Sequence, residues 1–166
     1  MVAAILLATA LAAAGSAEHH VRSSDRRIHG IFMRGLEQSP TLRQLVAILD
    51  DSDVIVYVDE QQRLPDLGGY LSHHVVAAGR IRYLRVKTTT AGPIGSVVAR
   101  MAHELQHAVE VAQAPAARDL ASLQRLFGQV GLSTACDPSR CFETQAARDV
   151  EFIVRAEMNK RSAPVR

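Results

Sequence analysis

Residues 93–112 read PIGSVVARMAHELQHAVEVA, and this stretch carries the clearest helical pattern in the chain together with a candidate metal-binding motif. Its apolar residues recur with the helical period and form one continuous stripe, made of Ile94, Val97, Val98, Met101, Leu105, Ala108, Val109 and Ala112. His103 and His107 lie together on the opposite side. The pattern predicts a helix from Pro93 to about Ala112 that packs along one side and presents both histidines from the other.

The centre of this helix is an HExxH motif, His103-Glu104-Leu105-Gln106-His107. Two histidines four positions apart lie one turn apart on one helix face, so both imidazoles can bind one Zn²⁺ ion. Glu104, between them, can act as a general base on a metal-bound water. Two solvated histidines on a polar face would give the same pattern, and this alternative stays open at the level of sequence.

A catalytic zinc needs a third protein ligand and an open position for water. Glu110 shares the metal face of the helix, but its Cα lies about 10.5 Å along the axis from that of His103, which favours a place behind a ligand or in solvent. Glu143 is expected in the first turn of a helix from Phe142 to Asn159, at the edge of its apolar face. A carboxylate directed at the core needs a partner, so Glu143 is the predicted third ligand.

Two further acidic residues of the same predicted helix are expected to stay outside the site. Glu151 is expected to point away from the face that carries Glu143. Glu157 lies about 21 Å further along the helix, and we expect it in solvent.

Two segments of the chain together resemble a known family. MAHELQHAVE (101–110) and FETQAARD (142–149) are similar to the gluzincin class of zinc metallopeptidases, in which HExxH lies on one helix and the third ligand is a glutamate on a later one. The chain also resembles small exported bacterial proteins that share a His-Glu-Leu-Gln-His helix. The resemblance covers Pro93 to about Glu157.

The resemblance implies a function and a set of site residues. It implies His103, His107 and Glu143 as Zn²⁺ ligands, Glu104 as the catalytic base, and a peptide or protein as substrate. It also implies a zincin-like minimal metallopeptidase core. One departure concerns the residues after Glu143, because longer gluzincins often carry Asp or Asn four or five positions later, where it orients a ligand histidine. Here those positions hold alanine and arginine, so the departure concerns the orientation of a ligand histidine and not the ligands themselves.

Outward from the metal helix, the remaining patterns predict an α+β domain with a small antiparallel sheet packed on helices. The expected elements are a helix over Thr41 to Leu49, strands over Asp53 to Asp59, Tyr70 to Ala78 and Arg80 to Thr90, and helices over Pro115 to Val130 and Phe142 to Asn159. The two strands on either side of Gly79 are expected to pair antiparallel.

The oxyanion formed during peptide hydrolysis needs a hydrogen-bond donor, and the sequence does not rank the candidates. They are Tyr83, His73, His74 and Arg148. By the family resemblance, the strand Arg80 to Thr90 is a candidate for the edge that pairs with an extended peptide. The alternative is that it is an ordinary strand inside the sheet.

The N-terminus has the pattern of an export signal. Val2 to Ala14 is an uncharged apolar run followed by Gly15-Ser16-Ala17, and its length of about 20 Å is short of the ~30 Å hydrocarbon core of a membrane. An Ala-rich helix that belongs to the fold is the alternative. We expect residues 1–17 as the signal, 18–27 as a polar linker, 28–160 as one domain and 161–166 as a tail, in a periplasmic or extracellular protein.

Composition and charge exclude other classes. The chain has 166 residues, of which 48% are hydrophobic and 22% charged, as in a folded globular domain. Its net charge of +2 comes from scattered arginines, which disfavours nucleic acid as a partner. Cys136 and Cys141 could pair or remain as thiols. Besides a peptidase, two functions stay open, namely a zinc-binding domain without turnover and a partner-binding module with an incidental HExxH.

Overall fold

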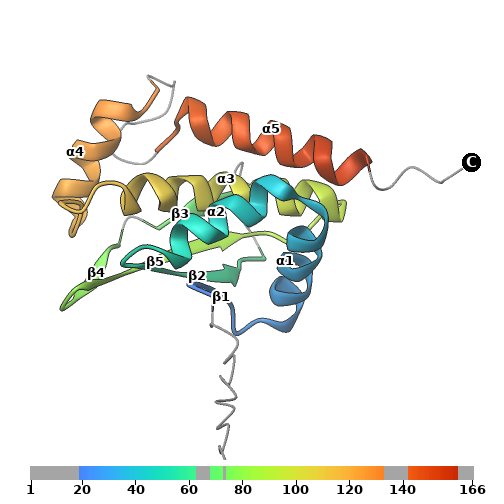
Figure 1. Ribbon diagram of the computed structural model, residues 1–166, viewed down its shortest axis with the longest axis horizontal. Helices are drawn as coiled ribbons and strands as arrows, with labels where there is room; N and C mark the ends of the chain where they lie inside the picture. The colour runs from blue at the N-terminus through green and yellow to red at the C-terminus, as the bar shows by residue number, and fades with distance from the viewer. Residues whose placement is uncertain (1–18, 63–67, 73, 133–141, 161–166) are drawn as a thin grey trace, which may run out of the picture.

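The computed structural model describes residues 19–62, 68–72, 74–132 and 142–160 (Figure 1). In chain order the elements are β1 (Val21–Arg22), α1 (Arg26–Gln38), α2 (Pro40–Asp50), β2 (Val54–Glu60), β3 (Gly69–Leu71), β4 (Val76–Ala78), β5 (Ile81–Thr88), α3 (Ile94–Ala112), α4 (Leu120–Val130) and α5 (Gln145–Lys160). The α+β class is therefore confirmed. Among the described residues no helix has both the length and the apolarity that crossing a membrane requires.

The sheet is mixed, which corrects the expectation of an antiparallel one. Its strand order is β1-β2-β5-β3, with β4 also paired with β5. β3 and β4 run antiparallel to β5, as expected, whereas β1 pairs parallel with β2 and β2 pairs parallel with β5. The physical reason is burial: β2 and β5 both line the core, while β4 is exposed along its whole length. β5 therefore inserts beside β2 and leaves β3 and β4 on its far side.

The strand order also shows whether the predicted strand Arg80 to Thr90 lies at an edge of the sheet or inside it. β5 lies inside the sheet, with β2 along one side and both β3 and β4 along the other. The expectation that it forms a peptide-binding edge is wrong, and its alternative, an ordinary sheet strand, is correct. Among the described strands, β3 and β4 form one edge of the sheet and β1 forms the other.

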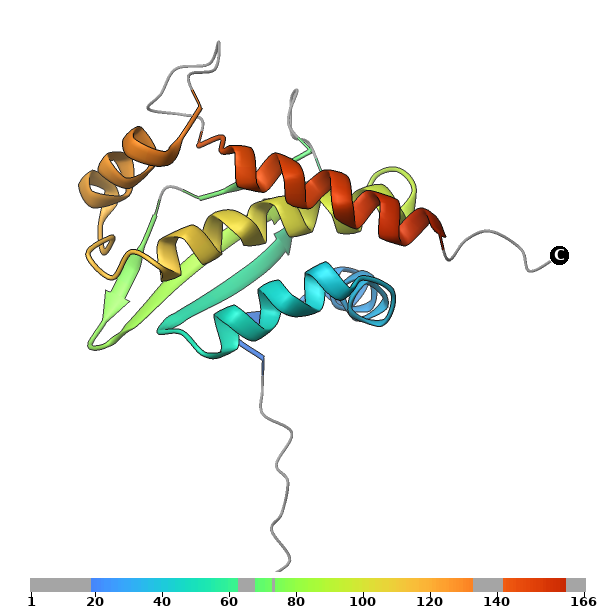
Figure 2. The ribbon, with the colours of Figure 1, turned by 45° about the horizontal axis from the view of Figure 1, so that its top comes forward.

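Helix α3 is the middle layer of the molecule. It packs on the sheet on one side and under α5 on the other, while α1 and α2 flank it (Figures 1 and 2). α3 is buried well beyond the predicted stripe, at Ala99, Ala102, Glu104 and His107. Other elements cover its histidine side as well: β3 lies beside Glu104, α4 beside His107 and α5 beside His103. The motif helix thus lies at the centre of the hydrophobic core, whereas the sequence predicted packing along one side only, and its polar side is covered by other elements.

Part of the expected N-terminal linker is folded. Residues 21–22 form β1 against β2, and Arg26–Arg27 begin α1, whose N-terminus is capped by the Asp25 carboxylate. Helix α1 was not predicted, although its apolar residues Ile28, Ile31, Phe32 and Leu36 recur with the helical period. It buries Ile28 and Phe32 against the core. Gly30 and Gly35 lower the intrinsic helix propensity of this stretch, and the Asp25 cap together with packing stabilises it as a helix.

Two helices begin later than their patterns predict. α4 begins at Leu120 rather than near Pro115, because Asp119 and Ser122 form a capping box at that point. α5 begins at Gln145, two residues after Glu143. Some predictions concern residues outside the described part of the chain. These are the signal at 1–17, the tail at 161–166, His73, Cys136 and Cys141.

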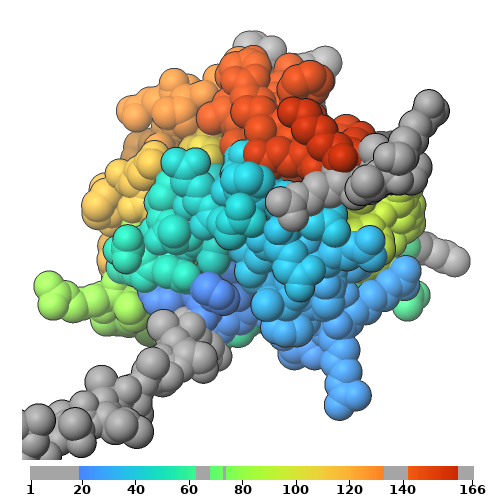
Figure 3. All heavy atoms as spheres, turned by 45° about the vertical axis from the view of Figure 1, so that its right-hand side comes forward, coloured from blue at the N-terminus to red at the C-terminus, as the bar shows by residue number. Residues whose placement is uncertain are grey.

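Glu157 corrects another expectation, since it is not left in solvent. Its carboxylate accepts hydrogen bonds from the hydroxyls of Ser39 (2.5 Å) and Thr41 (2.8 Å) at the start of α2. A negative charge at a helix N-terminus is favourable. Glu157 thereby ties α5 to α2, and the two helices lie side by side on the surface (Figure 3).

A buried arginine joins β5 to the end of the motif helix. Arg82 is fully buried, and its guanidinium donates to both carboxylate oxygens of Asp53, at 2.9 and 2.6 Å. It also donates to backbone carbonyls at and just beyond the C-terminus of α3, including those of Val111 (2.7 Å) and Ala114 (2.8 Å). Hydrogen bonds from Arg82 and its charge lower the pKa of Asp53. The strand thus fixes where α3 ends.

Candidate metal centre

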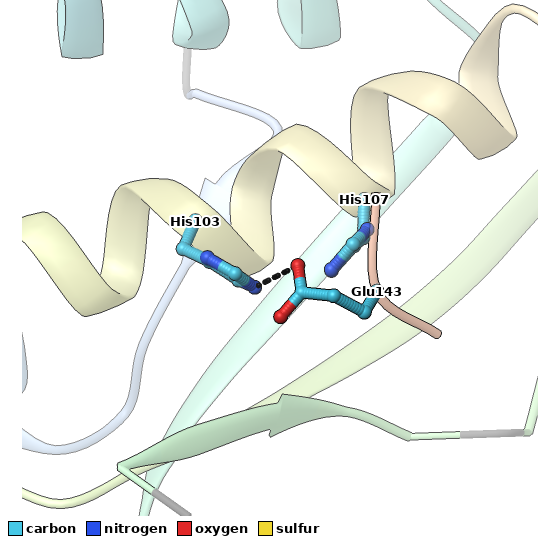
Figure 4. A group of neighbouring side chains, drawn as sticks. All are labelled: His103, His107 and Glu143. Atoms are coloured by element: carbon cyan, nitrogen blue, oxygen red, sulfur yellow. Dashed lines mark ion pairs between the residues drawn. The ribbon is translucent and has the colours of Figure 1, made fainter. Parts of the chain in front are cut away.

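The three predicted ligands come together in space. His103 and His107 extend from α3, and Glu143 reaches them from the segment just before α5 (Figure 4). One ligand atom from each residue lies within 4.8 Å of the others, and His103 Nε2 is 3.6 Å from Glu143 Oε1. Ligand atoms bound to one tetrahedral zinc lie about 3.3 Å apart, so the group is close to a binding geometry.

Glu143 reaches the site from a position other than the expected one. It precedes α5 instead of occupying its first turn, and the N–H of Thr144 donates to its Oε1 at 3.1 Å. The helical wheel that placed Glu143 and Glu151 on different faces therefore does not apply, because Glu143 is not part of the helix. Glu151, expected to point away, faces the site.

Each histidine has a carboxylate behind its other ring nitrogen. Glu110 Oε2 lies 2.9 Å from His107 Nδ1, and the Thr144 hydroxyl donates to Glu110 Oε1 at 2.6 Å. Glu151 Oε2 lies 3.2 Å from His103 Nδ1, within ion-pair distance but off the direction of a hydrogen bond. Carboxylates in this position orient a histidine and make it a better ligand. Glu110 thus stands behind the candidate ligand His107, as one of its two predictions had it, and Glu151 lies beside His103, where the sequence motif offered no acid.

The ring nitrogens of His103 and His107 that face Glu143 are available to bind a metal ion. His107 is 1% exposed, and within the described part of the chain its Nε2 has no hydrogen-bond partner. Burying such an atom without a partner is costly. Burial and the neighbouring His107 lower the pKa of His103, so this imidazole is neutral and available as a ligand at pH 7. Two imidazole nitrogens and one carboxylate form a donor set typical of catalytic zinc.

Glu104 lies beside this group, between α3 and β3. It is 6% exposed, and the backbone N–H of Leu71 in β3 donates to its carboxylate. A methyl group at Gly69 would lie 3.3 Å from Glu104 Oε1, so glycine lets the strand approach this closely. Burial raises the pKa of Glu104 to about 7, against the opposing effects of His107 and of the Leu71 N–H. A carboxylate with a pKa near neutral can both accept and release a proton.

The candidate oxyanion donors separate in the structure. Tyr83 stacks on Tyr57, with ring centroids 6.5 Å apart, and alternates along β5 with residues buried against the helices, so it lies on the sheet face away from α3. His74 is exposed between β3 and β4. Arg148 is at the site, because its Nε lies 3.6 Å from Glu143 Oε2.

The raised pKa of Glu104 predicts how pH affects the metal-free protein. Its folded state holds the proton more tightly than the unfolded chain, so stability should fall as pH rises from about 4.5 to about 7, by at most about 3 kcal/mol. Glu104→Gln should remove this loss. The variant is expected to be more stable than the natural chain at pH 8 and similar at pH 4.5, in urea unfolding after chelation of metals. If Glu104→Gln changed the free energy of unfolding equally at pH 4.5 and at pH 8, the raised pKa of Glu104 would be contradicted.

Glu37 offers a matched control for that experiment. It is an exposed glutamate on α1, far from the metal group in sequence and on another element. We expect Glu37→Gln to change stability by no more than about 0.5 kcal/mol, without the pH dependence.

Comparison with protein-family models, curated proteins and solved structures finds no match for this chain. A functional assignment therefore depends on the chemistry of the site alone.

Proposed function

We propose that this protein is a zinc-dependent peptidase of the gluzincin type with a zincin-like core. The observation that carries the proposal is the convergence of His103, His107 and Glu143 next to the buried carboxylate of Glu104. An incidental HExxH in a partner-binding module would have no need of a third ligand from a segment 36 residues away. The arrangement of the motif helix on a mixed sheet, with an edge strand beside the base, supports the same proposal.

The residues of the site would divide the work of hydrolysis as follows. His103, His107 and Glu143 would hold the zinc ion, which when bound would supply a Lewis acid. Glu104 would take a proton from the attacking water and return it to the leaving amine, for which its pKa near neutral is suited. Glu110, at hydrogen-bond distance from His107 Nδ1, would hold that imidazole in the tautomer that leaves Nε2 free, and Glu151 would act on His103 through its charge.

The substrate would approach along β3. This strand lies at the edge of the described sheet and packs against Glu104. An extended peptide can add to such an edge through main-chain hydrogen bonds, which places a carbonyl near the metal group without requiring a particular side chain. Arg148 is the candidate donor that the structure brings nearest to this group, through its contact with Glu143.

Metal analysis tests the proposal. We expect one zinc ion per chain in the purified protein, and its loss in His103→Ala and Glu143→Ala. Glu110→Gln and Glu151→Gln keep all three ligands, and each is expected to weaken zinc binding by about 10- to 100-fold because a ligand histidine loses its carboxylate. Competition with a chelator of known affinity measures these differences.

The zinc-binding measurements also need a control variant and a result that would contradict the proposal. Glu37→Gln on α1 makes the same chemical change far from the site and should bind zinc like the natural chain. A protein that takes up no zinc after incubation with excess Zn²⁺ would overturn the proposal. Zinc retained in Glu143→Ala but lost in Glu110→Gln would move the third ligand to Glu110.

A further inference from the structure

Helix α4 contacts His107 and the residue that precedes Glu143, although none of its own residues is a proposed ligand. Phe127 on α4 is 5% exposed, and its ring meets the ring of His107 edge to face, with centroids 5.5 Å apart and planes at 83°. The same ring stacks on Phe142, with centroids 4.3 Å apart and planes at 15°. Phe142 directly precedes Glu143 in the chain. The Phe127 side chain thus contacts both His107, a proposed ligand on α3, and Phe142, the residue before the proposed ligand Glu143.

The backbone after α4 is also attached to the third ligand. The N–H of Leu132 donates to the carbonyl of Glu143 at 2.7 Å. Glu143 lies before the first turn of α5, so the helix does not hold it in place. The two histidines, by contrast, are fixed by the packing of α3 at the centre of the core. Glu143 is therefore the ligand whose position depends on contacts from outside its own element.

From these contacts we infer that Phe127 is a positioning residue, which holds Glu143 against the histidine pair and so raises the affinity of the site for its metal. This inference rests on the proposed metal centre and adds a residue that no ligand motif contains. Its physical basis is preorganisation, because a ligand already held in place loses little conformational freedom when the metal binds. The stack of Phe127 on Phe142 restricts the backbone at Glu143, and the edge contact with His107 sets the distance between the two parts.

The test compares two phenylalanines that differ in their surroundings. Phe127→Leu keeps an apolar residue but removes the ring, and we expect zinc affinity of the full chain to fall about 10-fold, as for loss of other positioning partners. The absorption spectrum of the Co²⁺-loaded protein should also change, because it reports the geometry of the ligands. Phe152→Leu on α5 is the matched control, since Phe152 is 76% exposed, and should change neither quantity.

A second variant covers the case in which Phe127→Leu does not fold. Phe142→Leu removes the other half of the stack from a partly buried position, and the same loss of affinity is expected. Thermal unfolding of the metal-free proteins shows which variants are folded.

A double-mutant cycle separates positioning of Glu143 from a general effect on the fold. Glu143→Ala is expected to lose zinc on purification, so its residual affinity is measured by titration with excess Zn²⁺. In that background Phe127→Leu should cause no further loss of metal affinity, because the ligand that it positions is gone. An equal loss with and without Glu143 would overturn the inference, and so would an unchanged affinity in Phe127→Leu while the natural chain binds zinc. A natural chain that binds neither Zn²⁺ nor Co²⁺ would overturn the proposed function, and the inference with it.

Discussion

Replacing Glu104 with glutamine is expected to lower the rate of peptide hydrolysis by about 10²- to 10⁴-fold while zinc stays bound. Glutamine keeps the shape of the side chain and still accepts a hydrogen bond from the Leu71 N–H, but it cannot take a proton from water. The ligands His103, His107 and Glu143 are unchanged. Cleavage of a mixed peptide library, followed by mass spectrometry alongside zinc content, measures both quantities in one preparation.

The outcomes of this experiment distinguish the candidate functions. Glu37→Gln on the exposed face of α1 is the control and should cleave peptides at the natural rate. Hydrolysis that survives Glu104→Gln would show that Glu104 is not the base. A natural chain that holds one zinc ion but cleaves no peptide would favour the zinc-binding domain without turnover.

Replacing Arg82 with methionine is expected to lower the free energy of unfolding by about 2–4 kcal/mol, less than for a fully buried ion pair because the Asp53 side chain is 33% exposed. Methionine fills much of the same volume but leaves the Asp53 carboxylate and the carbonyls of Val111 and Ala114 without their donor. Because burying polar groups without partners is costly, most of the loss comes from the groups that remain. Urea unfolding of the metal-free protein at pH 7 measures the change.

Two comparisons check the cause of this loss. Arg80 lies two residues before Arg82 and is exposed, so Arg80→Met should change stability by at most about 0.5 kcal/mol. Arg82 lowers the pKa of Asp53, so the pair stabilises the protein above the ordinary pKa of an aspartate, about 3.9, and this contribution is lost as pH falls through the lowered value. The difference between the natural chain and Arg82→Met should therefore narrow in acid. A difference that is independent of pH would exclude the ion pair as its source.

The sequence predicted the local elements well where a single period governs them. α2, β2 and α3 lie within a residue or so of their expected bounds, because each shows one clear apolar pattern. α1 was missed although its apolar residues have helical spacing; its two glycines lower the helix propensity of the stretch but not its periodicity. The sheet was expected to be antiparallel because pairing was assigned between neighbours in the chain, whereas β5 pairs in parallel with the earlier strand β2.

The acidic residues at the site likewise include some that the sequence placed correctly and some that it did not. Glu104 and Glu110 belong to the motif helix, and their places relative to the histidines follow from helix geometry. Glu151 and Glu157 were both expected outside any contact, yet one faces His103 and the other caps α2. Their roles depend on how α5 crosses α3 and α2, which the pattern of α5 alone does not specify.

From the sequence alone come the candidate ligands: two histidines one turn apart, a glutamate between them and a later glutamate available as a third ligand. Helix geometry is enough to place the histidine pair, since residues i and i+4 share a face, whereas Glu143 lies on another segment and reaches the pair only through the fold. Only the tertiary structure decided which groups support the ligands, namely Glu151 behind His103, Phe127 against His107 and Arg82 at the end of α3. Those contacts join elements far apart in the chain, and the docking of helices and strands that creates them depends on the packing of the whole core.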